Sequence, residues 1–189
     1  GMYPMPDPTE IAQDFEDFFQ YVAGDWTVTN TTTHQTIGLV AGANGIVSTV
    51  GGASSVANDI GAIQSNPLNF NIPVNSASSS YPPTNQSWFY CAFKATTANN
   101  DLLVIGNCSS IATAAPTDGI YFTKAAGAST IQFVVRKSSS SLAATAYSTG
   151  TTTVATLANN TYIELGWYYD GKGNIDVFVN EAKVCSVDV

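Results

Sequence analysis

The stretch YIELGWYYDGKGNIDVFVN, residues 162–180, decides the fold class. Apolar side chains occupy every second position on both sides of a central turn: Ile163, Leu165, Trp167 and Tyr169 before it, and Ile175, Val177 and Val179 after it. A period of two is that of a β-strand, whose successive side chains point to opposite faces. The turn DGKG at 170–173 supplies the tolerance of positive φ that a tight turn requires. The stretch therefore predicts an antiparallel hairpin whose two arms face one core.

Strand chemistry continues outward from this hairpin. Runs rich in β-branched and aromatic residues, bounded by Gly, Asn and Ser clusters, predict strands at 26–29, 45–50, 59–64, 68–74, 88–94, 101–107, 119–124 and 130–137, and a closing strand at 182–187. Residues 78–84 and 137–153 are polar connectors within one domain, because apolar strand material continues on both sides of each.

The N-terminal segment DFEDFFQY, residues 14–21, has a different period. Its phenylalanines 15, 18 and 19 are spaced as on one face of a helix. We expect an extended arm and a short helix within residues 1–22, followed by one all-β domain over residues 23–189.

The charge balance excludes some partners. Fourteen acidic residues against six basic ones give a net charge of −8, the wrong sign for a phosphate backbone or an anionic membrane. Arg136 is the only arginine, and the five lysines are scattered. No apolar run approaches the roughly 20 residues of a membrane helix, and the sequence lacks the blocks of a signal peptide. We expect a soluble protein that binds neither nucleic acid nor membrane.

No constellation of residues predicts catalysis. A glycoside hydrolase needs two carboxylates flanking the scissile bond, whereas Glu164 and Asp176 have no acidic neighbour two positions away. His34 is the only histidine, and it lies in a polar run without a nucleophile elbow elsewhere. The sequence therefore predicts a protein that is not an enzyme.

Metal and cofactor sites are not predicted either. Asp170 begins a loop in which Lys172 and Ile175 replace a calcium ligand and the required glycine, so we expect Asp170 to hydrogen-bond the backbone of its own turn. The three cysteines match no zinc or redox spacing, and Cys91 lies in an apolar strand. We expect free thiols, with Cys91 buried.

Several motifs together resemble the concanavalin A-like jelly-roll domains of bacteriophage virion proteins. The matching elements are DFEDFF, Trp26 with a Gly-rich strand, WFYCAFK, DGIYF and GWYYDGKGNIDVFVN. The resemblance spans most of the chain and implies a two-sheet antiparallel jelly-roll sandwich. Such domains usually continue past the last hairpin into a further strand, whereas this sequence stops at Val189. The further strand that such domains have would then come from elsewhere in the chain, be missing from a fragment, or be replaced by a partner that covers the exposed edge.

The resemblance implies a non-enzymatic virion structural protein, or a capsid or tail decoration protein, which is assembled in the host cytoplasm. Its expected partners are other virion subunits or further copies of itself. The alternative is a lectin-like module that binds a surface glycan. Four aromatic residues are candidates for a ligand platform, or alternatively pack against connecting loops or a subunit neighbour: Tyr121, Tyr147, Tyr168 and Phe178.

Overall fold

The computed structural model describes residues 24, 26–30, 36–40, 46–50, 61–65, 86–109, 116–137, 140–141 and 152–188. Its regular elements are β-strands paired in antiparallel sheets, and no α-helix occurs in those ranges. The described residues therefore hold no helix that is long and apolar enough to cross a membrane. The all-β prediction is confirmed, whereas the helix expected at 14–21 and the strand expected at 68–74 lie outside the described residues.

The chain divides into two compact units, residues 2–70 and residues 71–189 with Gly1. The first unit contains two antiparallel pairs of strands: β1 (Trp26–Asn30) with β4 (Gly61–Ser65), and β2 (Thr36–Val40) with β3 (Ile46–Val50). Three of these strands match predicted ones within two residues. β2 was missed because it has a glycine at its centre, which weakens the strand signal.

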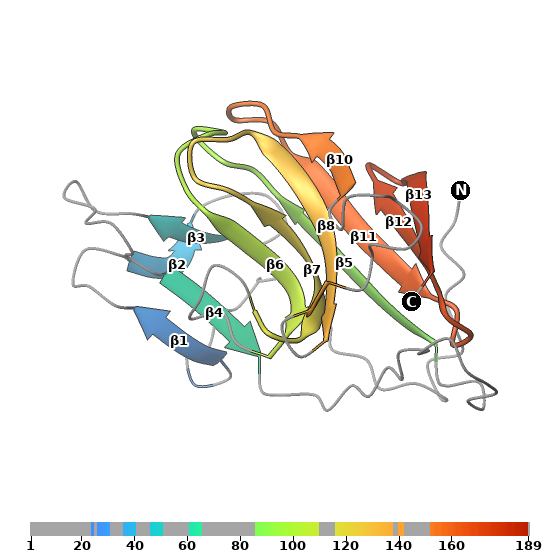
Figure 1. Ribbon diagram of the computed structural model, residues 1–189. Coiled ribbons are helices and arrows are strands. Elements are labelled where there is room, and N and C mark those ends of the chain that lie inside the picture. Colours follow the sequence, from blue (N-terminus) through green and yellow to red (C-terminus); the bar gives the residue numbers. More distant parts are fainter. Residues whose placement is uncertain are drawn as a thin grey trace. The chain divides into compact units, whose positions relative to one another are not determined.

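The second unit contains two larger antiparallel sheets. The four-stranded sheet has the order β13-β12-β11-β5. Its strands are β5 (Ser87–Phe93), β11 (Ile163–Tyr169), β12 (Asn174–Val179) and β13 (Ala182–Asp188). The five-stranded sheet has the order β10-β8-β7-β6 (Figure 1). Its strands are β6 (Leu103–Cys108), β7 (Gly119–Lys124), β8 (Thr130–Lys137), β9 (Ser140–Ser141) and β10 (Thr152–Thr156). The short strand β9 pairs with β8.

One apolar core joins these two sheets. The central hairpin contributes every second residue, as its period predicts, and Trp167, Leu165 and Val177 are at most 1% exposed. Phe122 and Phe133 come from the five-stranded sheet, and their ring centroids lie 5.2 Å apart. Because both sheets bury residues in the same cluster, the second unit is a β-sandwich.

The predicted connector at 137–153 is partly wrong. The short strand β9 lies within it, and β10 begins at Thr152 and pairs with β8 across an irregular register. Threonine and serine runs resemble loops by composition. Threonine also has a branched β-carbon that suits strands, so tertiary pairing decides the outcome.

Three connections at one end of the sandwich are hydrogen-bonded together. The amide of Ala98 donates to Asn159 Oδ1 at 2.7 Å, and the amide of Asn160 donates to the carbonyl of Ala95 at 2.8 Å. Lys124 is only 3% exposed, and its ammonium group donates to the carbonyls of Asp101, Ala125 and Ala128. These contacts fix the β5–β6 connection against the β7–β8 turn and the segment before β11.

Candidate contact surface on the four-stranded sheet

The four-stranded sheet carries aromatic side chains on the face turned away from the core. Alternation sends the residues between the core positions to this second face. The strand register aligns them in two rows that cross β5, β11, β12 and β13. We call these eight residues the aromatic outer face: Trp88, Tyr168, Asp176 and Ser186 in the first row, and Tyr90, Gly166, Phe178 and Lys183 in the second.

The rings of this face lie on β5, on β11 and at Phe178 of β12. Tyr90 is 50% exposed, while Trp88, Tyr168 and Phe178 are each partly exposed. Gly166 lies in register between Tyr90 and Phe178 and is buried, although it faces away from the core. Because Gly166 has no side chain, nothing from β11 projects between Tyr90 and Phe178 in this row.

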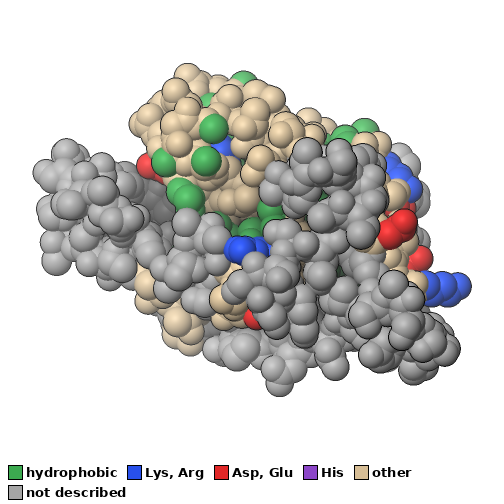
Figure 2. Space-filling view, in the orientation of Figure 1, with side chains coloured by type: hydrophobic (Ala, Val, Ile, Leu, Met, Phe, Trp, Pro, Cys, Tyr) green, Lys and Arg blue, Asp and Glu red, His purple; other side chains and the backbone are tan. Residues whose placement is uncertain are grey.

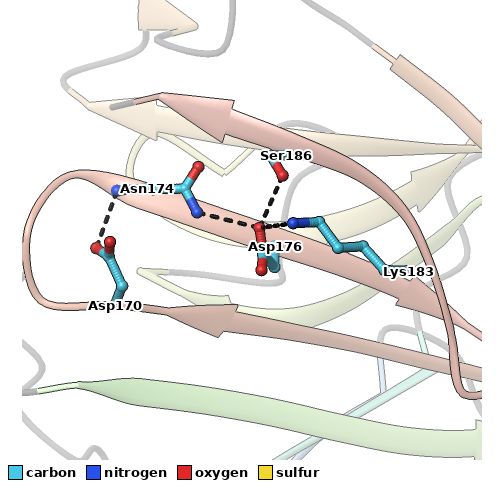
Figure 3. A network of polar contacts seen from close by, with 5 residues as sticks. All are labelled: Asp170, Asn174, Asp176, Lys183 and Ser186. Atoms are coloured by element: carbon cyan, nitrogen blue, oxygen red, sulfur yellow. Dashed lines mark hydrogen bonds and ion pairs between the residues drawn. The ribbon is translucent and has the colours of Figure 1, made fainter. Parts of the chain in front are cut away.

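A polar network occupies the part of the face on β12 and β13. Asp176 Oδ1 accepts hydrogen bonds from Ser186 Oγ at 2.7 Å and from Asn174 Nδ2 at 3.0 Å. The same oxygen lies 2.7 Å from Lys183 Nζ (Figure 3). Three donors from two strands thus converge on one carboxylate oxygen, and the Lys183 ammonium offsets its charge. Figure 2 shows acidic and basic side chains together at the right-hand edge, where Figure 1 places β12 and β13.

The turn beside this network is organised by Asp170. Its Oδ1 accepts hydrogen bonds from the amides of Lys172 at 2.7 Å and Asn174 at 3.1 Å. Gly171 and Gly173 have φ values of 76° and 110°, which side-chain-bearing residues adopt at a cost. The prediction that Asp170 serves its own turn is confirmed.

The surroundings shift the pKa values of two ionisable groups on this face, Asp176 and Tyr168. Burial opposes ionisation of Asp176, but the hydrogen bonds from Lys183, Ser186 and Asn174 and the Lys183 charge outweigh it and lower the pKa of the carboxyl. Burial raises the pKa of Tyr168, and the carboxylates of Asp170 and Asp176 raise it further. Tyr168 therefore stays a neutral hydrogen-bonding phenol at neutral pH.

The structure separates the four predicted aromatic candidates. Tyr168 and Phe178 share the aromatic outer face, one row apart. Tyr147 lies outside the described residues. Tyr121 is only 2% exposed, which rules out the surface platform and fits the alternative that it packs within the molecule. Its neighbour in register, Val134, is 4% exposed, which shows that the five-stranded sheet is covered there on the side away from the core.

Trp88 and Tyr90 were missed as surface candidates. The signal was present, because they alternate with Phe89, Cys91 and Phe93 in a strand whose other face packs into the core. The abundance of rings in this strand hid the alternation, since both faces are aromatic. Only the assignment of one face to the core identifies the other as outward.

Other candidate residues give no reactive site in the described ranges. No group of three or more His, Cys, Asp or Glu side chains there could hold a metal ion, and His34 lies outside them. Cys91, Cys108 and Cys185 are not in disulfides and are partly buried. Burial raises the pKa of the Cys91 thiol to about 12, although a backbone hydrogen bond at Leu165 opposes the shift. The Cys91 sulfur is therefore a poor nucleophile.

Comparison with known proteins supports the fold alone. No family model and no curated protein matches the sequence. The structure is similar to the crystal structure of a protein of unknown function, SO2946, from Shewanella oneidensis MR-1. The TM-score is 0.59 at 13% sequence identity, and the match covers 100% of this chain and 80% of the other.

Proposed function

We propose that this protein is a non-enzymatic virion structural or decoration protein that works by contact with other subunits. The observation that carries the proposal is the aromatic outer face, where Trp88, Tyr90, Tyr168 and Phe178 gather on one side of a sheet whose other side is filled core. Aromatic residues are enriched at protein interfaces because they offer large apolar areas together with polar edges.

The virion assignment and the finer jelly-roll topology rest on the motif resemblance. The motifs WFYCAFK, DGIYF and GWYYDGKGNIDVFVN correspond to β5, β7 and the β11–β12 hairpin, so all of them lie within the sandwich. A net charge of −8 with few charged residues also suits a protein that packs against neighbours and avoids nucleic acid. Assembly would take place in the host cytoplasm.

A carbohydrate-binding module is the second candidate, and the first row of the aromatic outer face favours it. Trp88 and Tyr168 are cross-strand neighbours beside Asp176, whose charge is offset by Lys183. Paired rings can stack on the apolar face of a sugar, while a nearly neutral polar network can hydrogen-bond to its hydroxyls. The same face could therefore attach a particle to a host surface glycan.

Two measurements separate these functions. Mass spectrometry of purified particles from cells carrying the gene should find the protein in multiple copies per particle. A glycan array should show no binding tighter than roughly millimolar. Absence from particles together with micromolar binding to one sugar class would replace the first proposal with the second.

A further inference from the structure

The β12–β13 hairpin joins a firmly buried strand to a loosely held one. In β12, Ile175 and Val177 are completely buried in the core. In β13, Val187 is the only buried residue, and Val184 is 45% exposed. A strand with few buried apolar contacts opens at a lower free-energy cost than the core strand beside it. β13 therefore opens at a lower cost than β12 would, and Val187 is the core side chain that leaves with it.

The turn between these strands is strained. Asn180 and Glu181 have φ values of 47° and 64°, so both are left-handed. Asparagine tolerates this conformation well, whereas glutamate does not. Two-residue hairpin turns with both central residues left-handed favour Asn-Gly. An extended conformation of Glu181 would release this strain, and strained short hinges favour exchange of the adjoining element between copies.

The edge of β12 fits the sequence of β13 specifically. Asp176 Oδ1 accepts a hydrogen bond from the Ser186 hydroxyl and forms an ion pair with the Lys183 ammonium, each at 2.7 Å. The register between these strands also shifts at Val177 and Phe178. An incoming strand must therefore supply a hydroxyl, an amine and an irregularity at matching positions. Among strands in the described part of the chain, β13 of a second copy supplies all three, because its sequence is the same as that of the β13 it replaces.

We propose that two copies of this chain exchange β13, so that each β13 completes the four-stranded sheet of the other copy. Lys183 and Ser186 of one copy then bind Asp176 of its partner. The pairing of β13 with β12 and the contacts of Asp176 are remade between copies, whereas the turn at Asn180 and Glu181, which is hydrogen-bonded to Glu164, changes conformation. The strain at Glu181 is present in the closed monomer and released in the exchanged dimer, so it favours the dimer. This inference does not depend on the proposed virion or glycan function.

The turn provides a matched pair of variants. Glu181→Gly relieves the left-handed strain in the closed hairpin, whereas Glu181→Val increases it because valine is β-branched. After incubation of the full chain at high concentration, light scattering should find the dimer fraction of Glu181→Gly reduced about fivefold or more from wild type. Glu181→Val should raise the fraction. Equal dimer fractions in both variants would overturn the proposal.

A charge-reversal mixture tests the exchange itself. Asp176→Lys and Lys183→Asp each place like charges together in a closed hairpin. In an exchanged heterodimer of the two variants, both ion pairs are opposite in sign again. Native mass spectrometry of the mixture should therefore show mainly the heterodimer.

The control mixture replaces Lys183→Asp with Lys172→Asp. Lys172 is exposed in the neighbouring turn and forms no ion pair with Asp176. This mixture should give no excess of heterodimer. Equal heterodimer in both mixtures, or none in either, would contradict exchange of β13.

Discussion

At the residue scale, position in the strand alternation decides what each aromatic side chain does. Trp167 and Trp88 lie one row apart in register, yet Trp167 is 1% exposed and Trp88 faces outward. Trp167 stacks on Phe89 with ring centroids 6.3 Å apart and an interplanar angle of 18°. Trp167 therefore packs the core, whereas Trp88 contributes apolar surface to the aromatic outer face.

The two tryptophans should therefore differ in their effect on stability. Trp167→Ala should lower the free energy of unfolding by roughly 3–5 kcal/mol, because it removes a large buried side chain and leaves a cavity. Trp88→Ala should cost clearly less, since its side chain is partly exposed already. Urea unfolding followed by circular dichroism measures both. Equal losses would show that the assignment of the two faces is wrong.

Cys91 should resist alkylation in the folded protein. With a pKa of about 12, roughly one thiol in ten thousand is ionised at pH 8, and burial also limits access. Iodoacetamide at pH 8 should modify Cys91 at least about a hundredfold more slowly in the native protein than in urea. Peptide mapping measures this rate. Similar rates in both states would mean that the Cys91 thiol is accessible in the folded protein.

At the element scale, the strand pair β6–β7 depends on a close backbone approach. Gly106 has a φ of 143°, and a Cβ added there would lie 2.6 Å from the carbonyl oxygen of Ile120 and 2.7 Å from the Cα of Tyr121. Backbone atoms cannot move aside as a flexible side chain can. The strand register in this half of the sheet therefore requires glycine at position 106.

Gly106→Ala should destabilise the protein more than Gly127→Ala does. Gly127 has a φ of 81° but open space around it, so alanine there suffers only the conformational cost of about 1–2 kcal/mol. Gly106→Ala adds a steric clash with two backbone atoms. Thermal unfolding of both variants tests the difference. A smaller effect at position 106 would argue against the tight pairing of β6 with β7.

The buried ammonium of Lys124 holds one end of the sandwich together. Lys124→Met leaves three carbonyls without this donor and should cost about 1–3 kcal/mol. The exposed Lys172→Met should change stability by less than about 0.5 kcal/mol. Urea unfolding at neutral pH compares the two variants. A neutral Lys124→Met would show that these hydrogen bonds contribute nothing net.

The pH dependence of this effect has a defined sign. Burial lowers the pKa of Lys124 in the folded state, and the nearby Asp101 carboxylate opposes the shift. Protonation therefore costs stability at neutral pH, and this cost disappears as the pH rises from the folded pKa toward the unfolded value of 10.5. The stability of wild type relative to Lys124→Met should increase between pH 7 and pH 10. A decrease would mean that the carbonyls outweigh burial.

Strands with strong alternation could be predicted from the sequence. Strands that depend on a pairing partner, and the burial of outward-facing residues, could not. The predicted strands 119–124 and 130–137 match β7 and β8 residue for residue, because apolar β-branched and aromatic residues fill them. β10 was hidden in a threonine-rich run and needed its partner β8 to define it. The exposure of Tyr121 was mispredicted, since alternation in one strand cannot reveal what covers the second face of its sheet.

At the scale of the whole molecule, the inner faces of the two sheets form the core, and the outer face of the four-stranded sheet is available for contacts. The core joins the two sheets of the second unit, and the outer face of the four-stranded sheet presents aromatic rings beside an internally neutralised polar network. Such a surface combines apolar area with fixed hydrogen-bonding groups, which suits specific contact without chemistry. The proposed function therefore makes this face the contact surface of the assembled protein.

Hydroxyl-radical footprinting of the free protein and of purified particles tests this claim most directly. Oxidation of Tyr90, which is 50% exposed in the free protein, should fall severalfold in particles, together with that of Trp88. Leu102, which is 45% exposed beside the other sheet, serves as the reference. Unchanged oxidation of Tyr90 and Trp88 in particles that contain the protein would show that the aromatic outer face is not the contact surface.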